Sequence, residues 1–268
     1  MAFIIVGVVL VLVALGLVLG SRSQKKKLGE IQSTETSTAA DLSDLAAAVA
    51  KDIGAGSFNQ IAEVKGTIEC AAPLVSELSE TSCVHYSMNV TREYEETYWE
   101  EDSEGHKVQR TRRGSESVAS NARSVPFMVR DPTGTIEVDP AGASIVDEKV
   151  FSQFQQGEAG GDGFRFGRFS FGSGFAALAG GRRTIGYRLE ESAVPVGRPI
   201  FVLGEAVDSG GRLRIGKPAK KGASFIVSLK SEEQLESGAK ALTSGLLIAS
   251  IVSAALGVAA LIFGVVKG

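Results

Sequence analysis

Hydrophobic residues gather in two uncharged segments, one at each end of the chain, with a long polar stretch between them. The first runs from Ala2 to Gly20 and the second from Ala241 to Val266. A helix rises about 1.5 Å per residue, so the first segment reaches about 28 Å, close to the hydrocarbon thickness of a bilayer. The second is longer, and tilt takes up its extra length. Both are predicted to be transmembrane helices, because lipid offers backbone groups no hydrogen-bond partners.

The first segment has an alternative interpretation as a cleaved signal peptide. Its start, Met1-Ala2-Phe3, lacks basic residues, and no A-x-A cleavage site precedes Ser21. A retained span is therefore favoured.

Basic residues lie mainly on the inner flanks of the two spans. They are Arg22, Lys25, Lys26 and Lys27 after the first, and Lys230 and Lys240 before the second, while Lys267 lies beyond it. Basic residues close to span ends tend to stay in the cytosol. We therefore expect an integral membrane protein with a cytosolic polar domain and both termini outside.

Residues 21–60 predict a juxtamembrane linker followed by a short amphipathic helix. The lysine run of the linker suits anionic head groups, so the lipid bilayer is itself an expected partner. From Ala39 to Asp52 the sequence is rich in alanine, and Thr38 with Asp41 has the spacing of a capping box. Gly54 and Gly56 end the helix. Its apolar face is predicted from positions i, i+3, i+7 and i+11, which are Leu42, Leu45, Val49 and Ile53.

The polar domain proper, residues 61–230, is predicted to be rich in β-strands. From Val84 to Tyr98, apolar and polar residues alternate as in a long half-buried strand. A turn at Asp102 to Gly105 leads into a returning strand, Lys107 to Arg113. The hairpin would set its acidic first strand against its basic second strand. A solvated, self-neutralised hairpin is favoured over a binding patch.

Short apolar runs separated by turns predict the other strands. They are Pro126 to Arg130, Thr135 to Val138, Ser144 to Val150, Pro199 to Ala206, Arg212 to Gly216 and Ser224 to Leu229. A capping box from Ser231 to Gln234 then starts a helix, residues 231–266, that continues into the second span. The predicted fold is a membrane protein in which two transmembrane α-helices bracket a β-rich α+β soluble domain, a small barrel or sandwich.

Residues 157–181 form a loop dominated by glycine and phenylalanine, predicted to be the least regular part of the domain. Its phenylalanines would leave a large apolar patch if all faced water. They either dip into the membrane interface or cover the edge of the barrel; they are Phe164, Phe166, Phe169, Phe171 and Phe175.

Composition and motifs give no sign of catalysis, so no catalytic residue and no cofactor are predicted. A net charge of −3 does not favour a nucleic-acid partner. Cys70 and Cys83 suit ordinary thiols of strands, and with His85 and His106 they are too scattered for a metal site. No nucleophile elbow, zinc-protease motif or P-loop is present.

Small residues recur in both spans. Gly245, Ala249, Ser253 and Gly257 are four apart in the second, and Gly16 and Gly20 end the first. Such ridges let helix backbones approach closely. They predict packing either between the two spans or between copies in a homo-oligomer.

Several short motifs of the polar domain resemble the GIDE, or BAM ("beside a membrane"), domain of membrane-anchored E3 ubiquitin ligases of mitochondria and plastids. The order of span, domain and span also resembles that family. The residues that carry the resemblance are Gly66, Pro73, Cys83, Tyr86, Trp99, Pro126, Phe127, Asp131, Gly134 and Gly204, with the neighbours of each in Val64-Lys65-Gly66, Gly197-Arg198-Pro199-Ile200 and similar runs.

The resemblance implies a domain that recognises a partner or substrate beside the bilayer. In the family a zinc-binding RING finger follows the second span, whereas this sequence ends two residues after it and has only four Cys and His residues. We therefore expect a partner-recognition or scaffold module that is not itself an enzyme and whose protein partner is unidentified. Such a stripped-down form suits a prokaryotic source, so the expected location is the cell membrane of a prokaryote. The alternatives are a non-catalytic component of an E3 ligase system and a structural organiser that oligomerises through its spans.

Overall fold

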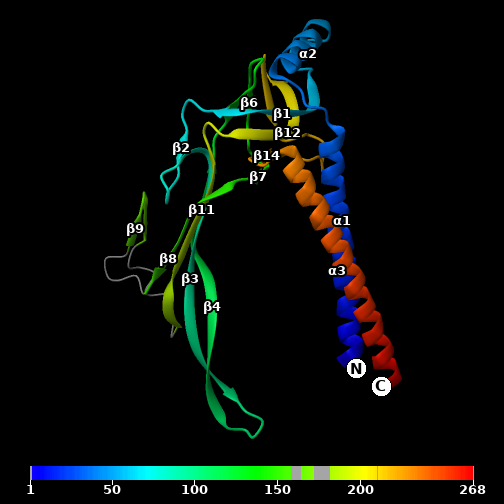
Figure 1. Cartoon of the computed structure of the whole chain (residues 1–268), viewed down its shortest axis with the longest axis vertical. Coiled ribbons are helices and arrows are strands. Elements are labelled where there is room, and N and C mark those ends of the chain that lie inside the picture. Colours follow the sequence, from blue (N-terminus) through cyan, green and yellow to red (C-terminus); the bar gives the residue numbers. More distant parts are fainter. Residues whose placement is uncertain (1, 158–163, 172–181, 210, 268) are drawn as a thin grey trace.

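Two long helices stand side by side below a β-rich domain in the computed structural model (Figure 1), which describes residues 2–157, 164–171, 182–209 and 211–267. They are α1 (Ala2–Ser33) and α3 (Glu232–Lys267). The helices run in opposite directions, so both ends of the chain lie at the same end of the molecule. By length and composition both could cross a membrane. Both predicted helices are present, but α1 continues to Ser33 through residues that were predicted to be a linker, because that segment has no glycine or proline strong enough to stop the helix after the apolar run. Helix α3 begins at its predicted capping box, where Ser231 and Gln234 exchange hydrogen bonds.

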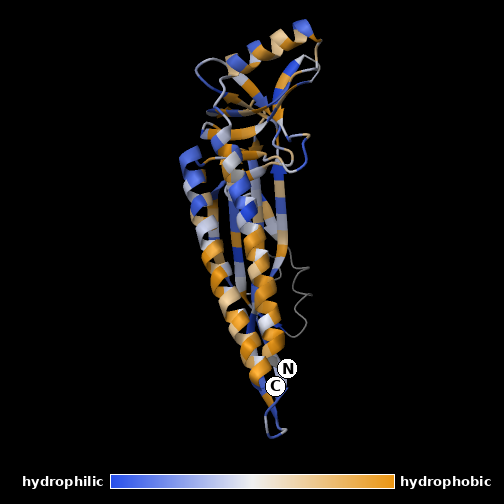
Figure 2. Cartoon of the chain, turned by 90° about the vertical axis from the view of Figure 1, so that its right-hand side faces the viewer, coloured by the Kyte–Doolittle hydropathy of each residue, from blue (hydrophilic) through white to orange (hydrophobic). Residues whose placement is uncertain are grey.

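The helix pair is held together along a seam of small residues. Its buried positions recur every seven residues: Gly7, Ala14 and Ser21 in α1, and Thr243, Ser250, Gly257 and Gly264 in α3. A seven-residue repeat keeps one stripe of each helix facing its partner. Both helices are hydrophobic along most of their length (Figure 2), and many of their large apolar side chains are exposed.

A small barrel forms the upper part of the β-rich domain. Its strands are β1 (Asn59–Glu69), β5 (Phe127–Arg130), β6 (Thr135–Val138), β13 (Arg212–Gly216) and β12 (Pro199–Ser209). They follow one another in that order, and pairing of β1 with β12 closes the circle. Two further strands continue beside β12: β14 (Ile226–Ser228) and β7 (Ser144–Val146). Of the two architectures that the sequence allowed, the structure has the barrel.

The helix α2 (Ala39–Asp52) lies across the top of the barrel (Figure 1). Its predicted bounds and capping box are confirmed, but its predicted buried face is partly wrong. Leu42 is buried, whereas Leu45 and Ile53 are exposed. The other buried positions are Ala39 and Ala46, and the Cβ of Ala39 would be only 3.5 Å from a Cβ at Gly134. Close approach to the barrel therefore selects alanines over leucine.

The second sheet is an elongated arm that runs down from the barrel (Figure 1). Its strands are β3 (Ser82–Glu101), β4 (Lys107–Ser124), β11 (Arg182–Pro195) and β8 (Glu148–Gln156), with the short β2 (Leu74–Val75) at its base. We call β3, β4, β8 and β11 the arm. The predicted hairpin is confirmed, with a longer return strand than expected.

Two strands of the arm depart from the sequence prediction. The predicted strand Ser144 to Val150 is in fact two strands, because the chain leaves the barrel at Asp147 and β8 joins the arm. Strand β11 was not predicted, although it pairs with both β3 and β8. The arm is thus a four-stranded sheet and not a lone hairpin.

Candidate recognition site at the junction of barrel and helices

The helix pair meets the barrel through a small apolar contact on the outer face of the barrel. Alternation along β12 turns Ile200 and Val202 into the barrel core and Phe201 and Leu203 outward. The outward side chains form a cluster with residues of β14, α1 and α3: Ile226, Ile31 and Leu235. This contact fixes where both helices leave the domain.

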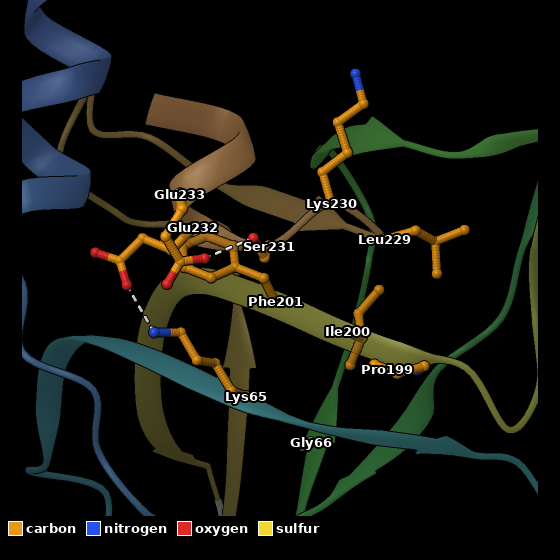
Figure 3. Close-up of a pocket in the computed structure, with 10 residues that line it drawn as sticks. All are labelled: Lys65, Gly66, Pro199, Ile200, Phe201, Leu229, Lys230, Ser231, Glu232 and Glu233. Carbon is orange, nitrogen blue, oxygen red and sulfur yellow. Dashed lines mark hydrogen bonds and ion pairs between the residues drawn. The ribbon is translucent and has the colours of Figure 1, made fainter. Parts of the chain in front are cut away.

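A groove opens beside this contact, where two neighbouring strands separate. β12 pairs with β14 only from Phe201 to Leu203, and the chain after β14 then turns toward α3. The separation leaves a cavity of about 330 Å³ (Figure 3). We call it the junction groove; it is lined by Lys65, Gly66, Pro199, Ile200, Phe201, Leu229, Lys230, Ser231, Glu232 and Glu233.

Lys65 links the groove to the start of α3. Its Nζ lies 2.6 Å from the Glu232 carboxylate and 3.1 Å from that of Glu63. Burial lowers the pKa of Lys65, but hydrogen bonds to Glu232 and Glu63 outweigh that effect and leave the pKa above its ordinary value. Lys65 is therefore a permanent cation that ties β1 to the first turn of α3.

Glu63 is buried beneath this pair. One of its carboxylate oxygens accepts a hydrogen bond from the Thr36 hydroxyl and forms an ion pair with Lys65. The other oxygen has no hydrogen-bond partner among the described residues. Burial of an acid requires such compensation. Through Thr36, the network also reaches the segment that follows α1.

Two carboxylates lie on the groove's side of α3. Glu232 is taken up by Lys65, whereas Glu233 accepts a hydrogen bond from the Ser231 hydroxyl at 2.6 Å. That bond lowers the pKa of Glu233 from its ordinary value. The groove thus combines an apolar floor with an ionised carboxylate at its rim.

Among the motif residues, Gly66 and the run Pro199-Ile200 come together at the groove, because Gly66 pairs with Ile200 and Thr67 with Pro199. A side chain at Gly66 would meet the Arg130 carbonyl oxygen, so glycine is needed where β1 crosses β5.

Other motif residues have architectural places. Asp131 accepts hydrogen bonds from Ala39 N at 2.7 Å and from Gly134 N at 2.8 Å, which fastens the start of α2 to the β5–β6 turn. Phe127 lies in the barrel core, next to Pro126. A side chain at Gly204 would meet Ile215 and Phe225 inside the barrel. These residues shape the barrel and do not line the groove.

The base of the arm holds Cys83 and Tyr86, both buried. Burial raises the pKa of the Cys83 thiol to about 11, so the thiol stays protonated and unreactive. The Tyr86 hydroxyl donates to Glu77. Pro73 is exposed just before β2, and Trp99, near the far end of the arm, is 65% exposed.

A buried acid that sequence reasoning missed, Glu191, organises the loop beside the arm. Its carboxylate accepts from the backbone N–H groups of Glu77, Leu78 and Ser79 and from the Ser79 hydroxyl. Burial raises the pKa of Glu191, but the hydrogen bonds from these donors lower it by more, so the pKa lies below its ordinary value. The signal was present in β11, where Tyr187, Leu189 and Ala193 alternate like a strand.

The same loop receives the short hairpin of β9 (Phe164–Phe166) and β10 (Phe169–Phe171). Backbone N–H groups of Arg168 and Phe169 donate to the Glu77 carbonyl. Phe166 and Phe169 pack against the apolar cluster of the arm. The sequence left two placements open for the phenylalanines, the membrane interface or the edge of the barrel. Phe166 and Phe169 cover a sheet, but that sheet is the arm and not the barrel. Phe175 lies outside the described residues.

The small residues predicted for span packing divide into two groups. At Gly257 a Cβ would meet Val11 and the Gly7 carbonyl, and the Ser253 hydroxyl donates to Leu10 O at 2.9 Å. A Cβ at Gly16 or Gly245 would meet nothing within 4 Å, and one at Gly20 only Leu246. The seam follows a seven-residue repeat, whereas positions four apart drift around a helix, so Ala249 and Gly245 leave the contact.

In the part of the chain that the structure describes, no three His, Cys, Asp or Glu residues lie close enough together to hold a metal ion. His85 shares a hydrogen bond with Ser124 at 2.8 Å and lies 4.0 Å from Asp147. Burial lowers the pKa of His85, which favours its neutral form.

Comparison with known proteins gives one family. Residues 95–263, more than half of the chain, match the model of the GIDE family, described as E3 ubiquitin ligase. Neither the curated proteins nor the solved structures contain a match. The match includes the outer arm, the barrel strands β5, β6, β12, β13 and β14, and most of α3. The chain therefore belongs to the GIDE family.

Proposed function

We propose that this GIDE protein is an integral membrane protein with two spans, whose β-rich domain recognises a protein partner beside the bilayer. The outward faces of α1 and α3 support the spans. Leu12, Ile251 and Val265 are all more than half exposed, and lipid is the environment that favours such side chains. Among the described residues, the small seam residues Gly7, Ala14, Ser250, Gly257 and Gly264 are buried between the helices.

The orientation in this proposal has the domain in the cytosol and both termini outside, and the flanking charges favour it. The proposed location is the cell membrane of a prokaryote. Lys25 and Lys26 follow the apolar part of α1, and Lys240 precedes that of α3. In this orientation the junction groove lies on the cytosolic side, above the bilayer surface, and is open to a cytosolic protein.

The recognition site in this proposal is the junction groove. The separation of β12 from β14 is the observation that carries it, because it opens a cavity of about 330 Å³ beside Pro199, Leu229 and the start of α3. The floor fits one apolar side chain of a partner, and Glu233 fits a neighbouring basic residue. Lys65 is already neutralised by two carboxylates, so it does not repel that residue.

Charge reversal at the groove tests the proposal. Glu233→Lys should reduce capture of the partner from native membranes about tenfold or more, the loss expected when an ionic contact becomes a repulsion. Glu236→Lys is the matched control, because Glu236 lies one turn further along α3, pairs with Lys240 and does not line the groove. The wild type first identifies the captured proteins. If Glu233→Lys and Glu236→Lys then capture those proteins equally well, the groove is not the recognition site.

A second candidate function is a component of an E3 ubiquitin ligase system, in line with the family description. The chain would then supply recognition, and a second chain would supply the RING finger. Co-purification of a RING-bearing protein, lost in the Glu233→Lys variant, is the expected result. Ubiquitylation of membrane proteins that is unchanged after deletion of this chain would count against it.

The third candidate is an organiser that oligomerises through its spans, favoured by the open space at Gly16 and Gly245. Gly245→Leu should then reduce the size of the assembly in mild detergent without disturbing the α1–α3 seam. Gly257→Leu is the comparison, since it should disturb the seam itself. An assembly of unchanged size in the Gly245→Leu variant removes this candidate.

A further inference from the structure

The arm and the helix pair leave the barrel in the same direction. Figures 1 and 2 show the arm running down at the same height as the helices, with the β3–β4 turn beyond the ends of α1 and α3. In Figure 1 the two are separated from each other sideways. The arm therefore occupies the heights that the apolar spans occupy.

The side chains of the arm are unsuited to that depth in a bilayer. Glu95 lies between Arg113 at 3.2 Å and Arg183 at 2.8 Å, and the two arginine side chains are 79% and 76% exposed. Glu96 is flanked in the same way, by Arg112 and Arg182. Exposed charges such as these are expensive in hydrocarbon.

The backbone of the arm is equally unsuited to lipid. Within the described ranges, β4 pairs with β3 along one edge and with no strand along the other. That outer edge presents the polar backbone groups of a strand from Lys107 to Ser124. An open sheet edge finds no hydrogen-bond partners in hydrocarbon. The arm must therefore stay in water when the spans are in lipid.

The junction offers a place where the two parts can reorient. The chain passes between helices and barrel only twice, at residues 34–38 and 229–231. Among the described residues, and apart from the apolar cluster, the helices contact the domain where Ser224 N donates to Glu30 at 2.8 Å, Lys26 donates to the Gly222 carbonyl and Lys65 pairs with Glu232. The first crossing is itself anchored to β1, because Thr36 and Ser37 donate hydrogen bonds to Glu63.

We propose that in a bilayer the helix pair is swung about these two crossings away from the angle described above, so that the arm lies outside the level of the spans and on the same side as the barrel. This inference rests on the two-span topology proposed above. The swing opens the contacts of Glu30 and Lys26 and changes the shape of the junction groove, because Leu229 to Ser231 are both crossing and groove wall. The groove is then the point at which a bound partner favours one angle over the other.

Accessibility to a membrane-impermeant maleimide tests the swing in intact cells and in inverted vesicles. Three variants of the full chain, each with one added cysteine in a Cys70→Ala background that keeps the buried Cys83, report on the three parts. They are Ser57→Cys for the barrel, Ser103→Cys for the turn of the arm and Lys267→Cys for the end of α3.

The swing predicts labelling of Lys267→Cys from outside and of both Ser57→Cys and Ser103→Cys only from the cytosolic side. Labelling of Ser103→Cys from outside, with Ser57→Cys labelled from the cytosol, would overturn the swing but leave the two spans intact. Labelling of Lys267→Cys and Ser57→Cys from the same side would instead disprove the two-span topology.

Trp99 provides a second measurement, because it is the single tryptophan of the chain and lies near the end of the arm. In vesicles that contain the whole protein, iodide added on the domain side should quench its fluorescence, and lipids brominated in their acyl chains should not. Quenching by the brominated lipids, with iodide ineffective, places the arm in the bilayer and contradicts the swing.

A chemical lock adds a direct control. Glu30→Cys with Ser224→Cys, joined by a short bismaleimide in detergent, should enter vesicles much less efficiently than the same variant left unlinked. Equal insertion of linked and unlinked protein would show that no opening at this contact is required.

Discussion

The barrel and the arm are both built from β-strands, yet they are stabilised in different ways. The barrel turns one face of every strand into a closed interior, where residues such as Val202 and Ile215 are fully buried. The arm has a small apolar cluster at its base and, further out, rows of Glu and Arg across β3, β4 and β11. Where apolar burial ends, charge pairing sets the register of the strands.

The largest difference should appear when one phenylalanine is truncated in each part. Phe127→Ala removes a buried ring from the barrel core and should lower the free energy of unfolding by about 3–5 kcal/mol. Phe154→Ala removes a partly exposed ring that contacts Arg188 on the arm and should cost under about 1 kcal/mol. Urea unfolding followed by circular dichroism measures both; equal losses would mean that the arm has a core of its own.

Glu191→Gln tests whether the base of the arm depends on a charge. The ionised carboxylate accepts four hydrogen bonds, so the variant should lose about 1.5–3 kcal/mol at pH 7. Because the folded pKa lies below its ordinary value of 4.5, this stability is complete above about pH 4.5 and disappears as the pH falls through the folded pKa. The difference between wild type and variant should therefore shrink below pH 4.5; a constant difference would contradict the assignment.

Two arginines of the arm allow a buried charge to be compared with an exposed one. Arg92 is buried and donates to Thr184, Glu116 and the Arg182 carbonyl, so Arg92→Met should cost roughly 1–2 kcal/mol. Arg113 pairs with Glu95 at the surface, and Arg113→Met should cost less than about 1 kcal/mol. Thermal unfolding of both variants in one detergent measures the two losses of stability. Equal losses would show that burial of Arg92 does not increase its contribution to stability.

Salt should produce the smallest effect. At 1 M ionic strength the screening length falls to about 3 Å, which weakens exposed pairs such as Glu100 with Arg110 by fractions of about 1 kcal/mol. Amide hydrogen exchange should become faster in the outer arm and stay unchanged in β1 and β12. Uniform acceleration in both parts would indicate a general loss of stability.

The sequence could predict most elements whose signals are local. The apolar part of α1, the whole of α3, α2 with its capping box, the β3–β4 hairpin and the strands β6 and β13 all follow from periodicity, turns and caps. The strand β11 escaped because its buried acid, Glu191, stands where an apolar residue would have continued the alternation of Tyr187 and Leu189. A buried carboxylate is intelligible only once its donors in the loop 77–79 are in place.

The candidate site was less predictable than the fold, because it depends on contacts between distant segments. Gly66 and Pro199 were singled out from the sequence, but their pairing in the barrel brings them together, and Glu233 was not singled out at all. The helix seam shows the same limit. A spacing of four residues is visible in the sequence, but the partner helix decides that the seam follows Thr243, Ser250, Gly257 and Gly264.

Closure of the barrel between β1 and β12 also imposes an order in time. Residues 59–67 of β1 pair with residues 199–207 of β12, so the barrel stays open during synthesis until about 140 further residues have been added. Throughout that interval α1 is already available to the membrane, and α3 follows within about 25 residues of closure. The ribosome therefore delivers the second span just as the domain becomes able to fold.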